Sequence, residues 1–134
     1  QDPEAVDLSG LANRTLRAML RAEEPIEEVE RIYAGYCHRE PRVVLEPDLA
    51  VRLAGLFLRT DRTDLGEPLL VRALKSSVPL QDAPSVLYRY AAHYRDRGRE
   101  RKRRACIGAL LRRYPDSLEA RTVREGAPES RGTE

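Results

Sequence analysis

A helical pattern that recurs at a shift of 36 residues constrains the fold of this 134-residue chain more than any other feature. In each copy, apolar residues stand three and four positions apart over two stretches joined by a turn, which is the spacing of one face of an α-helix. At this shift Ala54 aligns with Tyr90, and Leu74 aligns with Leu110. A single helix pair of this kind has too much apolar surface to stand alone, so the repeat predicts pairs that stack on one another.

Prolines and turn residues divide the chain into seven expected helices. Gly98 has no Cβ and is expected to adopt the left-handed conformation that ends many helices. The first expected helix starts at Leu8, and Pro25 opens the second, which ends before Pro41. Asp48 caps the third, and the fourth covers about 66–76. Pro84 opens the fifth, the sixth follows Gly98, and Asp116 caps a short seventh that reaches about Arg124.

The predicted fold is therefore all-α, with a single helical-repeat domain over residues 1–125. Its antiparallel helix pairs are expected at 8–40, 48–77 and 84–114, with a short C-terminal capping helix at 116–125. Residues 1–7 are expected to fray, the proline-bracketed segments 41–47 and 78–84 to be extended connectors, and residues 126–134 to be a disordered polar tail.

The residues that usually carry catalysis or bind metals are sparse. Cys37 and Cys106 each lie within an apolar helical pattern, so both are expected to be buried free thiols. No CxxC pair is present, and a structural zinc needs four ligands, so no metal site is expected. No phosphate-binding glycine loop, GxSxG or HExxH motif occurs either. The sequence predicts a protein that is not an enzyme and that holds no cofactor. The pattern Asn13-Arg14-Thr15 matches a glycosylation acceptor, which we discount because it falls on a helix.

The apolar residues do not form a membrane-spanning segment. No apolar run approaches the about 18 residues that a span needs, and no signal-peptide pattern is present. A cytoplasmic location is expected. Because the chain starts at Gln1 and its only methionine is Met19, an upstream signal or anchor stays open.

The charges are divided unevenly along the chain. Residues 1–50 carry 6 basic and 11 acidic side chains, a net charge of −5, whereas residues 51–134 carry 18 basic and 11 acidic side chains, a net charge of +7. The densest cluster, which we call the basic turn, consists of Arg97, Arg99, Arg101, Lys102, Arg103 and Arg104.

The basic turn has several interpretations. It is either a hydrophilic turn in a chain that favours arginine codons, or a patch for an acidic protein segment, an anionic lipid surface or nucleic acid. Nucleic acid is the least favoured of these ligands, because the run has no interleaved aromatic residues for stacking and the net charge of the chain is only +2.

Within each copy of the 36-residue pattern, the internal spacings resemble the tetratricopeptide repeat. That motif has a large residue, a small residue four positions later, an aromatic residue after three more, a turn, a second helix and a closing proline. In the second copy these positions are Leu87, Ala91, Tyr94, Gly98 and Pro115. The resemblance covers roughly residues 48–125 and implies a right-handed solenoid of helix pairs. It departs from the family early in the second helix, where Glu67 and Arg103 replace a small residue.

The resemblance also implies a binding groove lined by the first helix of each pair. Carried over by position, the groove residues are Leu49, Arg52, Leu56, Arg59, Ser85, Tyr88, Ala92 and Arg95. Because guanidinium groups bind carboxylates through paired hydrogen bonds, these residues predict a scaffold or adaptor module for an acidic or amphipathic peptide segment. The alternatives are that these residues are ordinary exposed side chains, that the basic turn of a membrane-associated protein contacts anionic lipid, or that the acidic and basic halves of two copies associate.

Overall fold

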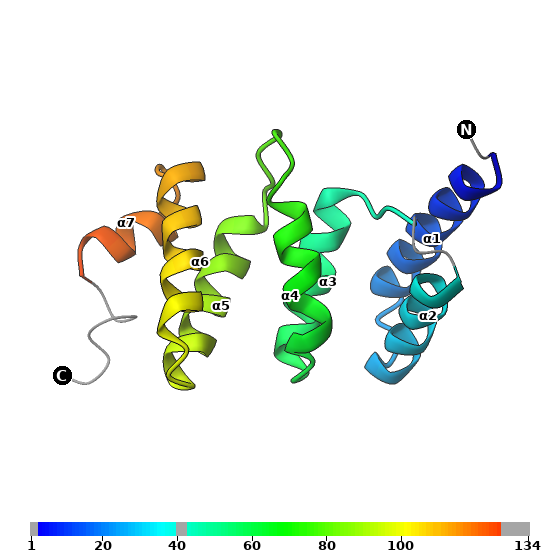
Figure 1. Cartoon of the computed structure of the whole chain (residues 1–134), viewed down its shortest axis with the longest axis horizontal. Helices are drawn as coiled ribbons and strands as arrows, with labels where there is room; N and C mark the ends of the chain where they lie inside the picture. Colours follow the sequence, from blue (N-terminus) through cyan, green and yellow to red (C-terminus); the bar gives the residue numbers. More distant parts are fainter. Residues whose placement is uncertain (1–2, 40–42, 127–134) are drawn as a thin grey trace.

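The computed structural model describes residues 3–39 and 43–126, and this part of the chain contains helices, turns and loops without a strand (Figure 1). The all-α class with about seven helices is confirmed. The helices are α1 (Pro3–Arg21), α2 (Ile26–Arg39), α3 (Pro47–Arg59), α4 (Thr63–Ala73), α5 (Ala83–Asp96), α6 (Glu100–Arg113) and α7 (Leu118–Arg124).

The helices form pairs that follow one another along the long axis of the molecule (Figure 1). α1 packs on α2, α3 on α4, and α5 on α6, while α3 also packs on α5. α7 packs on α5 and α6 and lies at the opposite end of the long axis from α1 and α2 (Figure 1). Helices close in sequence therefore make most of the tertiary contacts.

The turn inside each helix pair contains one residue with a left-handed backbone. Gly98 has a φ angle of +69°, as predicted for the turn between α5 and α6. Glu23 and Asp61 hold the equivalent place in the two earlier pairs, with φ angles of 54° and 68°. A side chain makes this conformation less favourable, so glycine content did not indicate a left-handed backbone at Glu23 or Asp61.

Several helix starts differ from the prediction. α1 begins at Pro3 rather than Leu8, so residues 3–7 are helical and not frayed. α3 begins at Pro47, and Glu46 rather than Asp48 holds the N-cap position. Proline has a preset helical φ and lacks only an N–H that would be unpaired at a helix start. It therefore suits the first helical position, and Asp48 falls in the first turn of α3.

The later starts differ for local reasons as well. α4 begins at Thr63 rather than Gly66, because the reversal at Asp61 returns the chain early. α7 is capped by Ser117 and not by Asp116, since the Ser117 side chain accepts a hydrogen bond of 3.0 Å from the backbone N–H of Ala120. Ser117 has the extended backbone that an N-cap residue requires. The predicted tail lies, apart from Gly126, outside the described residues.

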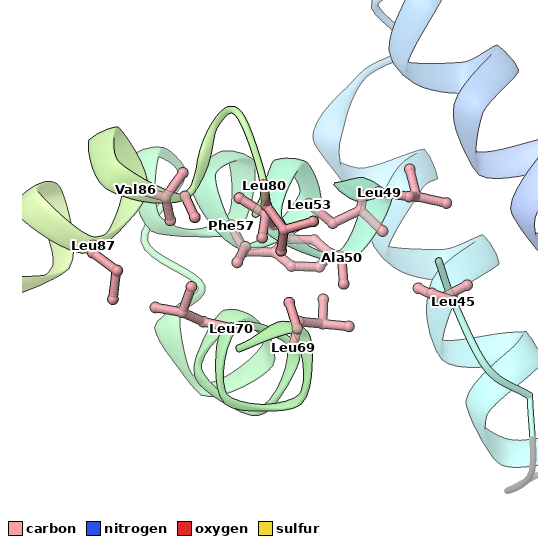
Figure 2. Close-up of a cluster of buried hydrophobic side chains, with 14 of the residues drawn as sticks. Leu45, Leu49, Ala50, Leu53, Phe57, Leu69, Leu70, Leu80, Val86 and Leu87 are labelled. Atoms are coloured by element: carbon pink, nitrogen blue, oxygen red, sulfur yellow. The ribbon is translucent and has the colours of Figure 1, made fainter. Parts of the chain in front are cut away.

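The hydrophobic core is centred on α3 (Figure 2). α3 contributes Leu49, Leu53 and Phe57, which are fully buried. α4 adds Leu69 and Leu70, α5 adds Val86 and Leu87, and the connectors add Leu45 and Leu80 (Figure 2). Ala50 and Ala54 complete the buried face of α3, whereas Leu58 is half-buried.

The two cysteines are free thiols in different surroundings. Cys106 is half-buried on α6, but Cys37 is exposed, so the prediction that both are buried is wrong for Cys37. Cys37 lies in the last turn of α2, one turn beyond Tyr33, whose ring contacts the Phe57 ring with centroids 5.6 Å apart. Helical periodicity predicts Cys37 on the packing face, but Tyr33 and Tyr36 make the packing at this end of α2 and leave Cys37 exposed.

Asn13 ties the first helix pair to the connector before α3. Its side-chain Nδ2 donates to the backbone carbonyls of Ser9 and Val44, at 2.8 and 3.0 Å, and its Oδ1 accepts from the backbone N–H of Glu46 at 2.8 Å. The side chain is buried. Its amide is thus held within the fold, which agrees with discounting Asn13 as a glycosylation acceptor.

Asn13→Ala is expected to lower the free energy of unfolding by about 1–3 kcal/mol, because backbone groups of the connector lose their partner. Chemical denaturation followed by circular dichroism measures the change. Arg14→Ala is the control, since Arg14 is an exposed neighbour on the same helix and its loss should change stability by less than about 0.5 kcal/mol. Equal effects of the two substitutions would contradict the role given to Asn13.

Candidate functional site

A cleft of about 280 Å³ opens between the exposed faces of α3 and α5, with the end of α1 beside it. Its lining residues are Leu20, Arg52, Gly55, Leu56, Arg59, Asp82, Ser85, Val86 and Arg89. A second hollow of about 220 Å³ shares Arg52 and Asp82 with it and continues toward Asp48 and Gln81. Together the two hollows make an extended groove along the first helices of the second and third pairs.

Helical spacing places the cleft residues. Arg52, Leu56 and Arg59 follow one another at intervals of four and three, so they share one face of α3. Ser85 and Arg89 share a face of α5 in the same way. The opposite faces of both helices are buried in the core, which fixes the direction in which the cleft residues point.

Gly55 brings the two walls of the cleft close together. A Cβ atom at this position would lie 3.2 Å from Cγ2 of Val86, which is tighter than an ordinary van der Waals contact. The absence of a side chain therefore lets α5 approach α3 closely. The floor of the cleft is apolar at this point, between Gly55 and Val86, and the arginines stand around it.

The cleft is cationic. Arg52, Arg59 and Arg89 are exposed, and within residues 3–39 and 43–126 none of the three forms an ion pair. Asp82 is the one acidic residue in the lining of the main hollow. Three guanidinium groups around an apolar floor can form paired hydrogen bonds with carboxylates while the floor contacts apolar groups.

The groove residues predicted from the sequence divide into two sets. Arg52, Leu56, Arg59 and Ser85 line the cleft, whereas Tyr88, Ala92 and Arg95 are not part of its lining. Arg95 instead contacts Asp96 on its own helix, with Nη2 3.0 Å from Oδ1.

Two positions require correction. Leu49 was predicted to face the groove, but it is fully buried in the core. Arg89 lines the cleft and was missed, although it follows Ser85 by one helical turn, and that spacing was the signal that could have found it.

The basic turn is largely neutralised by acidic side chains. Arg103 and Arg104 both contact Glu100, with hydrogen bonds of 3.0 Å from Nε of Arg103 and 3.2 Å from Nε of Arg104. Arg97 lies 3.8 Å from Asp61. In the described part of the chain, Arg99 and Arg101 are the two residues of the basic turn without an ion pair. The turn therefore offers less free positive charge than its sequence suggests.

Lys102 belongs to a separate interaction between α4 and α6. Its Nζ donates to both carboxylate oxygens of Glu67, at 3.1 and 3.0 Å, and lies 5.6 Å from the centre of the Tyr94 ring. The Tyr94 hydroxyl also donates to Glu67. Burial alone would raise the pKa of Glu67, but the hydrogen bonds from Tyr94 and Lys102 hold that pKa below its ordinary value. Glu67, which departs from the repeat pattern, thus has partners suited to its charge.

The half-buried Cys106 thiol lies near the Glu67 carboxylate. Burial and the neighbouring Glu67 carboxylate raise the pKa of the Cys106 thiol to about 11, so the thiol is protonated at neutral pH and is a weak nucleophile. Among the described residues, no three His, Cys, Asp or Glu side chains are grouped closely enough to hold a metal ion.

In the described part of the chain, the helices are too short or too polar to cross a bilayer.

No protein-family model, curated protein or solved structure matches this chain.

Proposed function

We propose that this chain is a non-enzymatic protein-interaction module of the tetratricopeptide-like class, in which helix pairs form a right-handed solenoid and the cleft between α3 and α5 binds an acidic segment of a partner protein. The 36-residue repeat and the packing of α3 on both α4 and α5 support the class. The observation that carries the function is the convergence of Arg52, Arg59 and Arg89 on one cleft with an apolar floor.

The chemistry of the cleft favours an acidic segment that also carries apolar residues. Carboxylates of the partner would bind the arginines, and an apolar side chain would contact Leu56 and Val86 on the floor. The partner, and a cytoplasmic setting for the complex, belong to the proposal.

Reversing two charges in the cleft tests this function. The probe is a fluorescein-labelled peptide of alternating glutamate and leucine, and binding is followed by fluorescence anisotropy. Arg52→Glu combined with Arg89→Glu is expected to raise Kd by about 100-fold or more, since hydrogen bonds to charged groups contribute about 1.5–3 kcal/mol each. Arg99→Glu combined with Arg101→Glu is the matched control, because it reverses two charges on the basic turn, outside the cleft.

Two outcomes would contradict the cleft as the binding site. The first is an unchanged Kd for the double variant, provided that circular dichroism shows the same helicity and Tm as for the parent chain. The second is equal binding of a peptide in which glutamine replaces every glutamate, because that peptide keeps the length and the leucines but lacks the carboxylates.

Contact of the basic turn with anionic lipid is the alternative function. It receives less support, because Glu100, Glu67 and Asp61 already contact four of the six basic residues of the turn. Flotation with phosphatidylserine vesicles separates the two proposals. Binding that Arg101→Glu weakens, and that Arg52→Glu with Arg89→Glu leaves unchanged, would favour the lipid surface.

A further inference from the structure

One acidic side chain stands in the cationic cleft, at the start of α5. Asp82 lines the main hollow opposite Arg52 of α3, and both residues also line the adjoining smaller hollow. Both are exposed. Among the described residues, neither forms an ion pair with the other or with a third side chain. The two opposite charges are therefore held apart on the two walls, with the hollows between them.

Local capping does not account for the Asp82 carboxylate. Asp82 occupies the N-cap position of α5, where aspartate is common because its side chain can accept hydrogen bonds from the first backbone N–H groups of the helix. The Asp82 side chain makes no such hydrogen bond, and its backbone is helical, with φ −89° and ψ −5°, rather than extended. The carboxylate is thus available to a ligand in the groove.

The charges of the groove are ordered along its length. α3 and α5 run in the same direction (Figure 1). Asp48 and Asp82 lie at the starts of these helices. The arginines follow, and Arg59 and Arg89 each lie about two turns or more beyond the acid on their own helix. Asp48 is already bound by Arg17, with Oδ1 2.9 Å from Nη2. Among the described residues that line the groove, Asp82 is therefore the acid without an ion pair.

We infer that the groove selects a partner segment with a basic residue at one end, an apolar residue in the middle and acidic residues at the other end. Asp82 binds the basic residue, and the arginines bind the acidic ones. This inference rests on the proposed function of the cleft and names the kind of segment that fits it. A uniformly acidic segment would leave Asp82 facing like charges, which costs affinity.

Helix geometry sets the spacing of the charges in the segment. Asp82 and Arg89 are two turns apart on α5, a separation of about 10 Å along the helix axis. An extended peptide advances about 3.3 Å per residue. The basic residue and the first acidic residue of the partner should therefore stand about three positions apart, with the apolar residue between them.

Four fluorescein-labelled peptides test this order of charges by fluorescence anisotropy in low salt. Two contain the sequences Lys-Gly-Leu-Glu-Glu and Glu-Glu-Leu-Gly-Lys between glycines, because the charges do not fix the direction of the peptide backbone. The other two have glutamine in place of lysine. The comparison between lysine and glutamine is made in the direction that binds more tightly.

The parent chain should bind the lysine peptide about two- to fivefold more tightly than the glutamine peptide, the range of an exposed ion pair. High salt should remove this preference by screening. In Asp82→Asn the preference should reverse. Three arginines then surround a cleft without an acid, so that lysine adds repulsion and the glutamine peptide binds more tightly.

Asp64→Asn is the matched control. Asp64 is an exposed aspartate in the first turn of α4 and lies outside both hollows, so the variant removes the same charge from a helix start. It should keep the preference of the parent chain for lysine. Circular dichroism should show that both variants retain their helices, since the Asp82 side chain caps no backbone group.

The outcomes separate this inference from the function on which it rests. If none of the four peptides binds the parent chain, and the peptide of alternating glutamate and leucine does not bind either, the proposed function is overturned and the inference with it. If the peptides bind and lysine brings no gain over glutamine, the inference alone is overturned, whatever the variants show. A gain that Asp82→Asn retains, or that Asp64→Asn also loses, would overturn the role given to Asp82.

Discussion

Gly66→Ala is expected to destabilise the fold by about 2–3 kcal/mol, although alanine is the better helix former. A Cβ atom at Gly66 would lie 2.1 Å from the hydroxyl of Tyr90 and 3.1 Å from the carbonyl oxygen of Ala54. Tyr90 is fully buried and donates a hydrogen bond of 2.8 Å to that carbonyl, so its ring has no free space to move into. Urea denaturation followed by circular dichroism measures the loss in free energy of unfolding. A thermal scan of the same variant should show a Tm lower by about 8–12 °C.

Gly35→Ala is the matched control for this prediction. Gly35 lies within α2, and a Cβ there would have no neighbour within 4 Å. The same substitution should therefore stabilise the protein by about 0.5–1 kcal/mol, through the helix preference alone. Opposite signs at the two glycines are the expected result, and a stabilising Gly66→Ala would show that Tyr90 does not occupy this space.

A double variant isolates the clash. Tyr90→Phe alone should cost about 1 kcal/mol, because one buried hydrogen bond is lost. In the Tyr90→Phe background, Gly66→Ala should cost at least about 1 kcal/mol less than in the parent chain, since the hydroxyl that it would meet is gone. If the free-energy changes of the two substitutions simply add, the cost of Gly66→Ala does not come from a clash with the Tyr90 hydroxyl.

Phe57→Ala is expected to destabilise the protein by about 3–5 kcal/mol, the range typical of a buried phenylalanine truncated to alanine. Phe57 is fully buried on α3, and its ring contacts that of Tyr33 on α2. The substitution thus opens a cavity in the core and removes a contact between the first and second helix pairs. Urea denaturation followed by circular dichroism measures the loss.

Val71→Ala is the control for Phe57→Ala. Val71 is 59% exposed on α4, so its truncation should change the free energy of unfolding by less than about 0.5 kcal/mol. A loss below about 1 kcal/mol for Phe57→Ala would contradict the central place that the structure gives to Phe57.

The 36-residue repeat has a direct physical expression in the hydrogen bond between Tyr90 and Ala54. The two residues hold equivalent positions in successive helix pairs, and the hydroxyl of the later one binds the backbone of the earlier one. The first pair is joined by other contacts, among them Asn13 at the connector, the Tyr33–Phe57 ring contact, and Arg17, whose Nη2 lies 2.9 Å from Oδ1 of Asp48. This difference agrees with the absence of the repeat pattern from the first pair.

The sequence alone predicted the seven helices, because burial of a helix face depends on residues three and four apart, and this spacing is visible in any window of the chain. It predicted the left-handed conformation of Gly98 for a similar reason, since only the local backbone is involved. The helix starts at Pro3, Pro47 and Leu118 were misplaced, because several neighbouring residues can begin a helix and small differences in cap geometry decide among them.

The candidate site depended on tertiary structure to a greater degree. Helical spacing identified Arg52, Leu56 and Arg59 on one face of α3, but the rotation of α5 against α3 decided that Arg89, and not Arg95, lines the cleft. In the same way, the sequence showed Lys102 as one of six basic residues in a turn, and only the structure placed it on Glu67. Local periodicity determines which face of a helix is buried. Which charged groups then meet is decided by the relative placement of helices that lie more than 30 residues apart, as Glu67 and Lys102 do.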